Sequence, residues 1–520
     1  MIAGLERYRT EPIRSYCRSR PTGEREKAGL INTQSRTVQT RTVVATTSSP
    51  FPRPIGSRQR FSALLAATAL GVYLLLIIGA TTSLTNAASA CSTWPTCHAP
   101  ADPLSQTELV IAWGHRLAAV IVGLLVAATA VTAVLGDVSS RVRWTIIAAA
   151  VLYVIQVGVG AATAIFGPAA IVPGLHLTLG LVIFTGIVLA LAWDLELATG
   201  EANDAIEQPE PLESVAADGE APASRPLPAG GLVRARLTAF AYFKMMKPRL
   251  MWLLCLVAAA GMALAAGPAL TVSTIVATLG GGVLAIGASG TFNHVLERDI
   301  DQKMSRTADR PLATELIPVR NAMAFGVLLT IASLATFLTI NLLAAALGLA
   351  AIVFYSVVYT LVLKPNTVQN TVIGGAAGAL PALIGWAAVT NEIGWPALAL
   401  AGVIFLWTPA HFYNLALAYK DDYARGGFPM MPVVRGETET RKHIVYYIAA
   451  TLVSTIALAW ITDLGALYAA TVAIFGGIFL WFAIRLHFEQ TEAAAFRSFH
   501  ASNAFLGAVL IAVLIDALVI

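Results

Sequence analysis

The stretch that decides the fold is LLAAALGLAAIVFYSVVYTLVL, residues 342–363, which contains no charged side chain. An α-helix needs about 20 consecutive apolar residues to cross the hydrocarbon core of a bilayer, which is about 30 Å thick. The strands of a transmembrane barrel would instead alternate in hydrophobicity over about ten residues. The stretch therefore predicts a membrane-spanning helix and disfavours a barrel.

The same composition extends along the whole chain. Of its 520 residues, 57% are hydrophobic and only 12% are charged, and the mean hydropathy is +0.71. A soluble protein carries about twice that charged fraction. The composition excludes a soluble globule and indicates an all-α integral membrane protein.

Thirteen apolar stretches are long enough to span a bilayer. Four precede a polar segment and nine follow it, so we expect a four-helix bundle followed by a nine-helix bundle. The expected spans lie near residues 62–84, 109–135, 144–166, 172–194, 250–267, 269–292, 319–341, 342–363, 371–390, 393–415, 443–463, 466–485 and 500–520.

The basic residues test this count. If residue 1 lies in the cytoplasm, none of the 34 Lys and Arg residues falls in an outer loop, and Arg116 alone lies well inside a span. Inner loops carry an excess of basic residues. We therefore expect a multi-pass protein of the cell membrane with a cytoplasmic N-terminus and an outer C-terminus. This sorting accounts for the net charge of +4 without a nucleic-acid partner.

Composition divides the chain into four parts. Residues 1–60 are basic and lack apolar periodicity, so we expect a disordered arm. Residues 61–195 form the four-helix domain, residues 196–236 an acidic cytoplasmic linker rich in Pro and Gly, and residues 237–520 the nine-helix domain. Polar segments of this kind are typical of solvated linkers.

The longest polar loop of the second domain reads NHVLERDIDQKMSRTADRPL, residues 293–312. If helical phase continues through it, Asn293, Glu297 and Asp301 share one face. Two carboxylates and an amide suit Mg²⁺, which completes its shell with water and substrate phosphate. Donors suited to diphosphate oxygens surround them: Arg298, Lys303, Arg306, Arg310 and, from the end of the eighth span, Lys364.

A second polar stretch, HFYNLALAYKDDYARGGFPMMPV at 411–433, follows on the same inner side. Asn414 and Asp422 are eight residues apart and therefore share a face, with His411 about one turn earlier. We interpret Asn414 and Asp422 as further magnesium ligands. The alternative is that such loop charges only solvate helix ends, but paired carboxylates are less easily explained in that way.

The four-helix part carries its own polar residues. His115 and His176 enter the second and fourth spans at matching depth, and two intramembrane imidazoles at one level are suited to ligating haem iron. Arg116 is a candidate partner for a haem propionate. In the first outer loop, the spacing of Cys91 and Cys97 allows a disulfide on the oxidising side.

Both inner loops, together with the stretch at 355–390, closely resemble the intramembrane aromatic prenyltransferase superfamily, and within it the protohaem IX farnesyltransferases. The resemblance covers about residues 240–520. It implies a bundle around a cavity in which both acidic motifs bind Mg²⁺ and farnesyl diphosphate, so that Asn293, Glu297, Asp301 and Asp422 are the catalytic residues. It also implies transfer of the farnesyl group to a vinyl group of protohaem IX, giving haem O for haem-copper oxidases.

The same resemblance gives roles to further residues. Tyr355 and Tyr359 could offer π faces to an allylic cation, or they could anchor the helix at the membrane interface. His411 could contact the acceptor haem or act as a general base, and a hydrogen-bonded structural histidine is an equal alternative.

The segment GATTSLTNAASACSTWPTC, with WGHR at 113–116 and VPGLH at 172–176, resembles one half of the haem A synthases. Only one half is present, and Ala112 stands where that family has Glu. We therefore expect haem binding or hand-over, and haem A synthase or oxidase assembly proteins as partners. Two alternatives stay open: prenylation of a quinone or other lipid acceptor, and a non-enzymatic haem carrier.

Overall fold

The computed structural model describes residues 57–84, 87, 93–95, 107–166, 172–201, 204, 231–462 and 464–519. Every regular element in these residues is helical. Thirteen spans within them have the length and hydropathy needed to cross a membrane. The predicted all-α class and the predicted number of spans are both confirmed.

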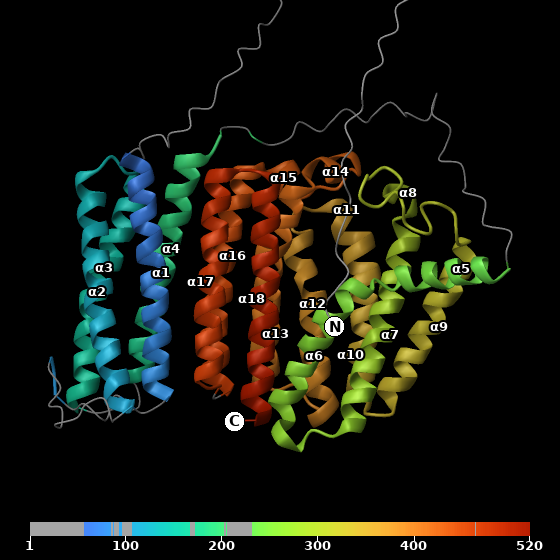
Figure 1. Ribbon diagram of the computed structural model, residues 1–520, viewed down its shortest axis with the longest axis horizontal. Coiled ribbons are helices and arrows are strands. Elements are labelled where there is room, and N and C mark those ends of the chain that lie inside the picture. Colours follow the sequence, from blue (N-terminus) through green and yellow to red (C-terminus); the bar gives the residue numbers. More distant parts are fainter. Residues whose placement is uncertain are drawn as a thin grey trace, which may run out of the picture. The chain divides into compact units, whose positions relative to one another are not determined.

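The elements follow the predicted order (Figure 1). The first bundle contains α1 (Ser57–Leu84), α2 (Thr107–Leu135), α3 (Ser140–Phe166) and α4 (Val172–Thr199). The long helices of the second part are α6 (Pro248–Ala266), α7 (Val272–Leu296), α9 (Val319–Leu338), α10 (Leu342–Val353), α12 (Asn370–Thr390), α13 (Trp395–Ala418), α16 (Glu437–Thr462), α17 (Ala466–Glu489) and α18 (Glu492–Val519). Shorter elements are α5 (Gly231–Met245), η3 (Gly267–Ala269), α8 (Arg298–Asp301), η4 (Phe354–Leu363), α11 (Lys364–Asn366), α14 (Lys420–Arg425) and α15 (Met431–Val434).

The stretch that predicted the fold is not one regular α-helix. After α10 the chain continues as the π-helix η4, in which the Thr360 hydroxyl donates to the Tyr355 carbonyl oxygen five residues earlier at 2.8 Å. The rings of Tyr355 and Tyr359 lie on this segment with their centroids 5.5 Å apart. π-Helical turns occur often at functional sites, so η4 is a candidate part of a functional site.

The helices around the acidic segment extend further than expected. α4 continues to Thr199, and α5 begins at Gly231, within the predicted linker 196–236. In Figure 1, α5 runs across the direction of the long helices. It exposes Leu232, Phe240 and Phe243 beside its basic residues, a composition typical of a helix that lies in a membrane interface.

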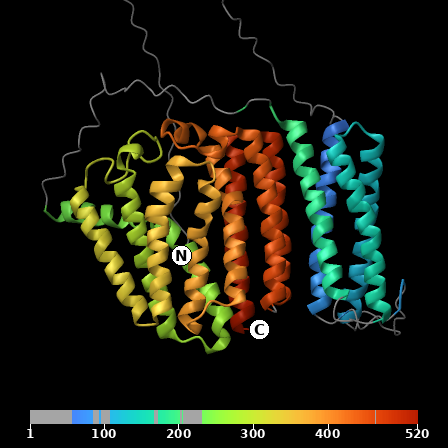
Figure 2. The same cartoon turned by 180° about the vertical axis from the view of Figure 1, so that it is seen from behind.

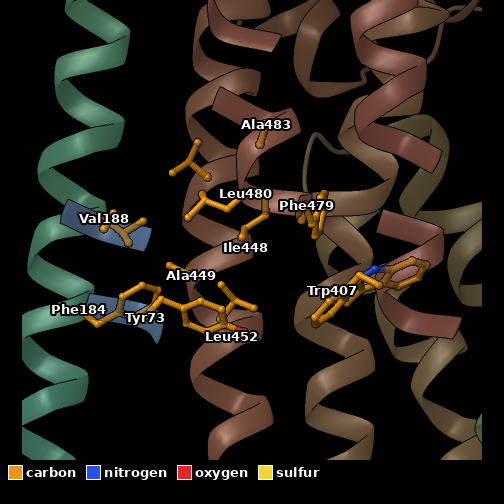
Figure 3. Packing of buried hydrophobic residues seen from close by; sticks show 14 of the residues in the cluster. Tyr73, Phe184, Val188, Trp407, Ile448, Ala449, Leu452, Phe479, Leu480 and Ala483 are labelled. Carbon is orange, nitrogen blue, oxygen red and sulfur yellow. The ribbon is translucent and has the colours of Figure 1, made fainter. Parts of the chain in front are cut away.

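The first bundle packs against the second through α1 and α4 on one side and α16 and α17 on the other, and both views show these helices side by side (Figures 1 and 2). Tyr73 and Phe184 lie in the same buried cluster as Leu452 and Leu480 (Figure 3). The hydroxyl of Tyr73 donates to the Val472 carbonyl oxygen at 2.6 Å. A single continuous apolar core therefore joins the two parts.

Polar contacts between α4 and α16 accompany this core. The indole N–H of Trp193 donates to the Tyr446 hydroxyl at 2.6 Å, and the Lys442 amine donates to Glu196 at 2.7 Å. Both contacts are partly buried. They fix the register of the two helices, because each needs a matching partner at one height.

Candidate active site

The first acidic cluster forms where α7 ends. Helical phase does not continue as expected: α7 stops at Leu296, and Glu297 takes φ −101° and ψ 5° before the short helix α8 begins. The backbone N–H of Asp301 donates back to the Glu297 carbonyl oxygen at 2.8 Å. The turn still leaves the carboxylates of Glu297 and Asp301 close together, because one guanidinium reaches both.

That guanidinium belongs to Arg310. Its Nη1 donates to both carboxylate oxygens of Asp301 at 2.8 Å and lies 3.8 Å from Oε2 of Glu297. The other oxygen of Glu297 accepts from the Lys364 amine at 2.5 Å. Both carboxylates are buried, with Glu297 only 4% and Asp301 only 2% exposed. The structure thus brings four of the predicted residues together, counting Arg310 and Lys364.

Asn293 completes this cluster from the last turn of α7. Its Nδ2 donates to the Thr360 hydroxyl at 3.2 Å, and its Oδ1 accepts from the amine of Lys247. Lys247 also donates to the Tyr355 hydroxyl at 3.1 Å. Through these contacts the end of α7 is tied to the π-helix η4 and to the residue that precedes α6.

Lys247 is a site residue that the sequence reasoning missed. It has φ 58° and ψ 55°, in the left-handed region, where non-glycine residues are uncommon. Gly290 permits the close approach: a Cβ there would lie 2.7 Å from the Met245 carbonyl oxygen. The only local signal in the sequence was a basic residue just before a span, and many other Lys and Arg residues stand in similar positions beside the spans.

The second acidic loop closes onto the first. The carboxylate of Asp422 accepts from the Ser305 hydroxyl at 2.7 Å and from the backbone N–H of Arg306 at 3.1 Å. It also accepts from the Arg425 guanidinium three residues later. The two loops predicted to carry the site therefore meet, at the end of the bundle that holds α8, α11 and α14 (Figure 1). Ser305 and Arg425 were not predicted, because neither residue type is distinctive in a polar loop.

The charges set the protonation of these acids. Burial alone would raise the pKa of Glu297, but Lys364, Lys247 and Arg310 outweigh it and hold that pKa below its usual value. Burial raises the pKa of Asp301, and Arg310 offsets only part of the effect.

Two other groups at this end have shifted pKa values. Burial opposes ionisation of Asp422, yet the hydrogen bonds from Ser305, Arg306 and Arg425 lower its pKa. Burial also lowers the pKa of Lys247 to about 7.

The remaining predicted residues differ in their surroundings. The guanidinium of Arg306 donates to the Tyr423 hydroxyl at 3.2 Å and lies 4.8 Å from the centroid of the Tyr419 ring. Arg298 pairs instead with the exposed Asp299 at 2.9 Å, and Lys303 is exposed. The structure does not bring Arg298 into the cluster.

Asn414 and His411 lie on the last turns of α13. The amide of Asn414 donates to the Ala410 carbonyl oxygen at 2.7 Å, while its buried Oδ1 has no hydrogen-bond partner among the described residues. His411 stacks between Trp407 and Phe499, and its Nδ1 lies 2.7 Å from the Ser502 hydroxyl. These contacts favour the structural alternative stated for His411.

An apolar chamber lies next to the cluster, between α6, α7, α10 with η4, and α12. Lys247 and Tyr355 line its polar end, and Leu254, Ala285 and Ile384 are among its apolar walls. A charged cluster at the mouth of an apolar cavity suits a ligand with an anionic head and a long hydrocarbon tail.

In the four-helix bundle, His115 and His176 each have a buried Nδ1 without a hydrogen-bond partner among the described residues. Glycines face both rings: a Cβ on Gly79 would lie 3.2 Å from Cε1 of His115, and one on Gly160 would lie 3.0 Å from Cε1 of His176.

Arg116 donates to the Thr93 carbonyl oxygen at 2.8 Å. This contact directs its guanidinium to the first loop. Cys91 and Cys97 lie outside the described residues.

Two family models match this chain. The UbiA prenyltransferase family matches residues 253–509, and a cytochrome oxidase assembly protein family matches residues 62–255. A UbiA homolog from Archaeoglobus fulgidus bound to GPP and Mg²⁺ gives a TM-score of 0.43 at 17% identity, covering 53% of this chain and 99% of that one.

Two relatives match most of the sequence of this chain. The Protoheme IX farnesyltransferase of Haloarcula marismortui is 63% identical over 461 residues, which are 88% of this chain and 98% of the relative. The Protoheme IX farnesyltransferase of Halobacterium salinarum is 60% identical over 466 residues, covering 89% and 98%. The chain therefore belongs to the protohaem IX farnesyltransferase family.

Proposed function

We propose that the chain transfers the farnesyl group of farnesyl diphosphate to a vinyl group of protohaem IX and releases diphosphate, giving haem O for haem-copper oxidases. One observation carries the chemistry. Two inner loops, joined by Ser305 and Asp422, hold a buried set of carboxylates and cations at the polar end of an apolar chamber. The family gives the acceptor.

The donor set fits Mg²⁺. Nη1 of Arg310 contacts oxygens of both Glu297 and Asp301, so both carboxylates face the same small region. Mg²⁺ prefers such oxygen ligands and keeps a place for phosphate. We assign Asn293, Glu297, Asp301, Asn414 and Asp422 as the ligands. Bound there, Mg²⁺ would neutralise charge on the diphosphate.

The basic residues act on the diphosphate directly. Arg310 and Lys364 form ion pairs with the carboxylates of Asp301 and Glu297 in the structure. Together with Arg306, they are the donors that we assign to the diphosphate oxygens. Negative charge accumulates on the leaving diphosphate as the bond from farnesyl C1 to oxygen breaks. Fixed cations in a buried site stabilise that developing charge.

The chamber protects the resulting allylic cation from water. The ring of Tyr355 lines the chamber, and the ring of Tyr359 lies next to it; such faces attract a cation. The vinyl group forms the new carbon–carbon bond to C1, which moves the positive charge to the haem substituent. Water then adds to that carbon and loses a proton, leaving a hydroxyethylfarnesyl side chain.

For the four-helix part, we propose that His115 and His176 ligate a haem for binding or hand-over. The support is their two Nδ1 atoms, which have no hydrogen-bond partner among the described residues, and the glycines against which both rings pack. The protein is expected in the cell membrane with a cytoplasmic N-terminus, where haem A synthase and oxidase assembly proteins are candidate partners.

A pigment assay tests the proposed reaction. Purified protein in detergent receives haem B, farnesyl diphosphate and Mg²⁺, and the extracted pigments are analysed by mass spectrometry. The proposal predicts haem O in amounts that rise with time and enzyme concentration. Unchanged haem B, together with farnesylation of an added quinone precursor, would assign the chain to a different acceptor.

A further inference from the structure

The apolar chamber follows α7 away from the acidic cluster. The residues of α7 that line it follow one another at intervals of one or three positions: Thr278, Leu279, Gly282, Ala285, Ile286, Ser289 and Gly290. This spacing is one face of a helix. At a rise of about 1.5 Å per residue, the distance from Gly290 to Thr278 is roughly 18 Å.

This length can be compared with that of a prenyl chain. Cα atoms three bonds apart in an extended chain are about 3.8 Å apart, so a farnesyl chain of some eleven main-chain bonds extends about 14 Å, and a geranyl chain about 9 Å. Gly282 lies eight residues beyond Gly290, or roughly 12 Å. If C1 lies near Gly290, next to Lys247 and the cluster, a geranyl chain ends before Gly282 and the third isoprene unit of farnesyl lies beside it.

Gly282 leaves open space at this depth. It lines the chamber, and a Cβ built on it meets no atom within 4 Å. Its neighbour Gly281 differs, because a Cβ there would lie 2.9 Å from the ring of Phe337 on α9. Gly281 serves helix packing, whereas helix packing does not account for Gly282.

We propose that Gly282 is a specificity-determining residue, which keeps the chamber open for the third isoprene unit and so sets the length of prenyl diphosphate that the protein accepts. This inference rests on the proposed function for the identity of the donor. Gly282 lies within α7 and belongs to neither acidic loop, so the inference assigns a role to a residue outside the diphosphate site. A large side chain at 282 fills the far part of the chamber and leaves the part near Lys247 intact.

Gly280 provides a matched control. It precedes Gly282 on the same helix and is also free of atoms within 4 Å of a Cβ, but it does not line the chamber. Gly280→Phe therefore makes the same change in helix propensity and apolar area as Gly282→Phe, on another face. A second variant, Gly282→Leu, is tested in the same binding experiment, so that the prediction can still be checked if Gly282→Phe does not fold.

The experiment measures dissociation constants of the unreactive S-thiolodiphosphate analogues of geranyl and farnesyl, with Mg²⁺, for the full chain and each variant. The wild type and Gly280→Phe should prefer the farnesyl analogue. Gly282→Phe or Gly282→Leu should weaken farnesyl binding at least about tenfold, since the third unit loses its apolar surroundings, and should change geranyl binding less than about threefold.

Two results would overturn the inference: an unchanged ratio of farnesyl to geranyl affinity in the Gly282 variants, or an equal change in the Gly280 variant. Equal loss of both ligands in the Gly282 variants would also contradict it, because that pattern indicates a defect common to all donors. Wild-type turnover is measured in the same preparation. Absence of haem O there, with the ratio changed as stated, would refute the proposed acceptor while supporting the role of Gly282.

Discussion

Asp301 and Asp299 lie two residues apart and form a natural pair of substitutions. Asp301 is buried against Arg310, whereas Asp299 is exposed and pairs with Arg298. Asp301→Asn removes a charge that the proposed Mg²⁺ requires, so we expect haem O formation to fall by at least about a hundredfold. The initial rate of haem O formation is the measurement.

Asp299→Asn is the control for the same chemical change. It should keep its rate within about twofold, because an exposed ion pair contributes little. If both variants lost activity equally, the loop would be sensitive to charge in general and Asp301 would have no special role.

Lys247 predicts a pH dependence of stability in the metal-free protein. Burial lowers its pKa from the ordinary 10.5 to about 7. Above pH 7 the folded chain has released a proton that the unfolded chain still holds, so the free energy of unfolding should rise with pH. Below pH 7 both states are protonated, and this contribution becomes constant.

The check is the unfolding midpoint in EDTA at pH 7 and pH 9. Relative to Lys247→Met, the wild type should gain stability between these values, by no more than about 1.4 kcal/mol per pH unit. Parallel behaviour of the two proteins would show that Lys247 does not titrate in this range.

At the residue scale, the sequence indicated the acidic and amide residues of the site but did not indicate the side chains that contact them. The types and spacing of Asn293, Glu297 and Asp301 suggested an oxygen-lined site without any structure. Lys247 lies 46 residues before Asn293 and contacts it only because α6 packs against α7. A contact of that kind depends on tertiary packing and has no local pattern.

At the scale of elements, the contact of α1 with α17 depends on one glycine. A Cβ on Gly476 would lie 2.5 Å from the Tyr73 hydroxyl and 2.7 Å from Leu452, whereas one on Gly477 meets only Leu70 at 3.9 Å. Gly476→Ala should weaken the contact between the two bundles by about 1–3 kcal/mol through overpacking. Gly477→Ala should be neutral or slightly stabilising.

The measurement uses a protease site inserted at residues 205–230. After cleavage in detergent, the wild-type and Gly477→Ala halves should copurify, while the Gly476→Ala halves should separate more readily. Equal retention of all three would mean that the buried contact of Tyr73 does not hold the bundles together.

Hydropathy predicted the spans well because burial in lipid is a property of whole stretches. It could not predict the π-helix η4 or the end of α7 at Leu296. Such irregularities depend on individual hydrogen bonds, such as that from Thr360 to Tyr355, and on contacts that Glu297 makes with Lys364 on another helix.

At the scale of the whole molecule, the two bundles should have separable chemistry. His115 and His176 lie in the four-helix part, and none of the acidic cluster does. If these histidines hold a haem as proposed, the double variant His115→Ala, His176→Ala should lose a low-spin Soret band, because both proposed ligands are removed, while farnesyl transfer persists within about threefold. Spectroscopy and the transfer assay on one preparation test this. Loss of both properties together would contradict the division.

We propose that the two acidic loops hold a prenyl diphosphate through a divalent cation. The most direct test of this proposal is calorimetric binding of the farnesyl S-thiolodiphosphate analogue, with Mg²⁺ or with EDTA, to the wild type and to Asp301→Asn. We predict that the wild type binds at least about tenfold more tightly with Mg²⁺, and that Asp301→Asn loses this difference. Equal affinity of the wild type in Mg²⁺ and in EDTA would contradict the account.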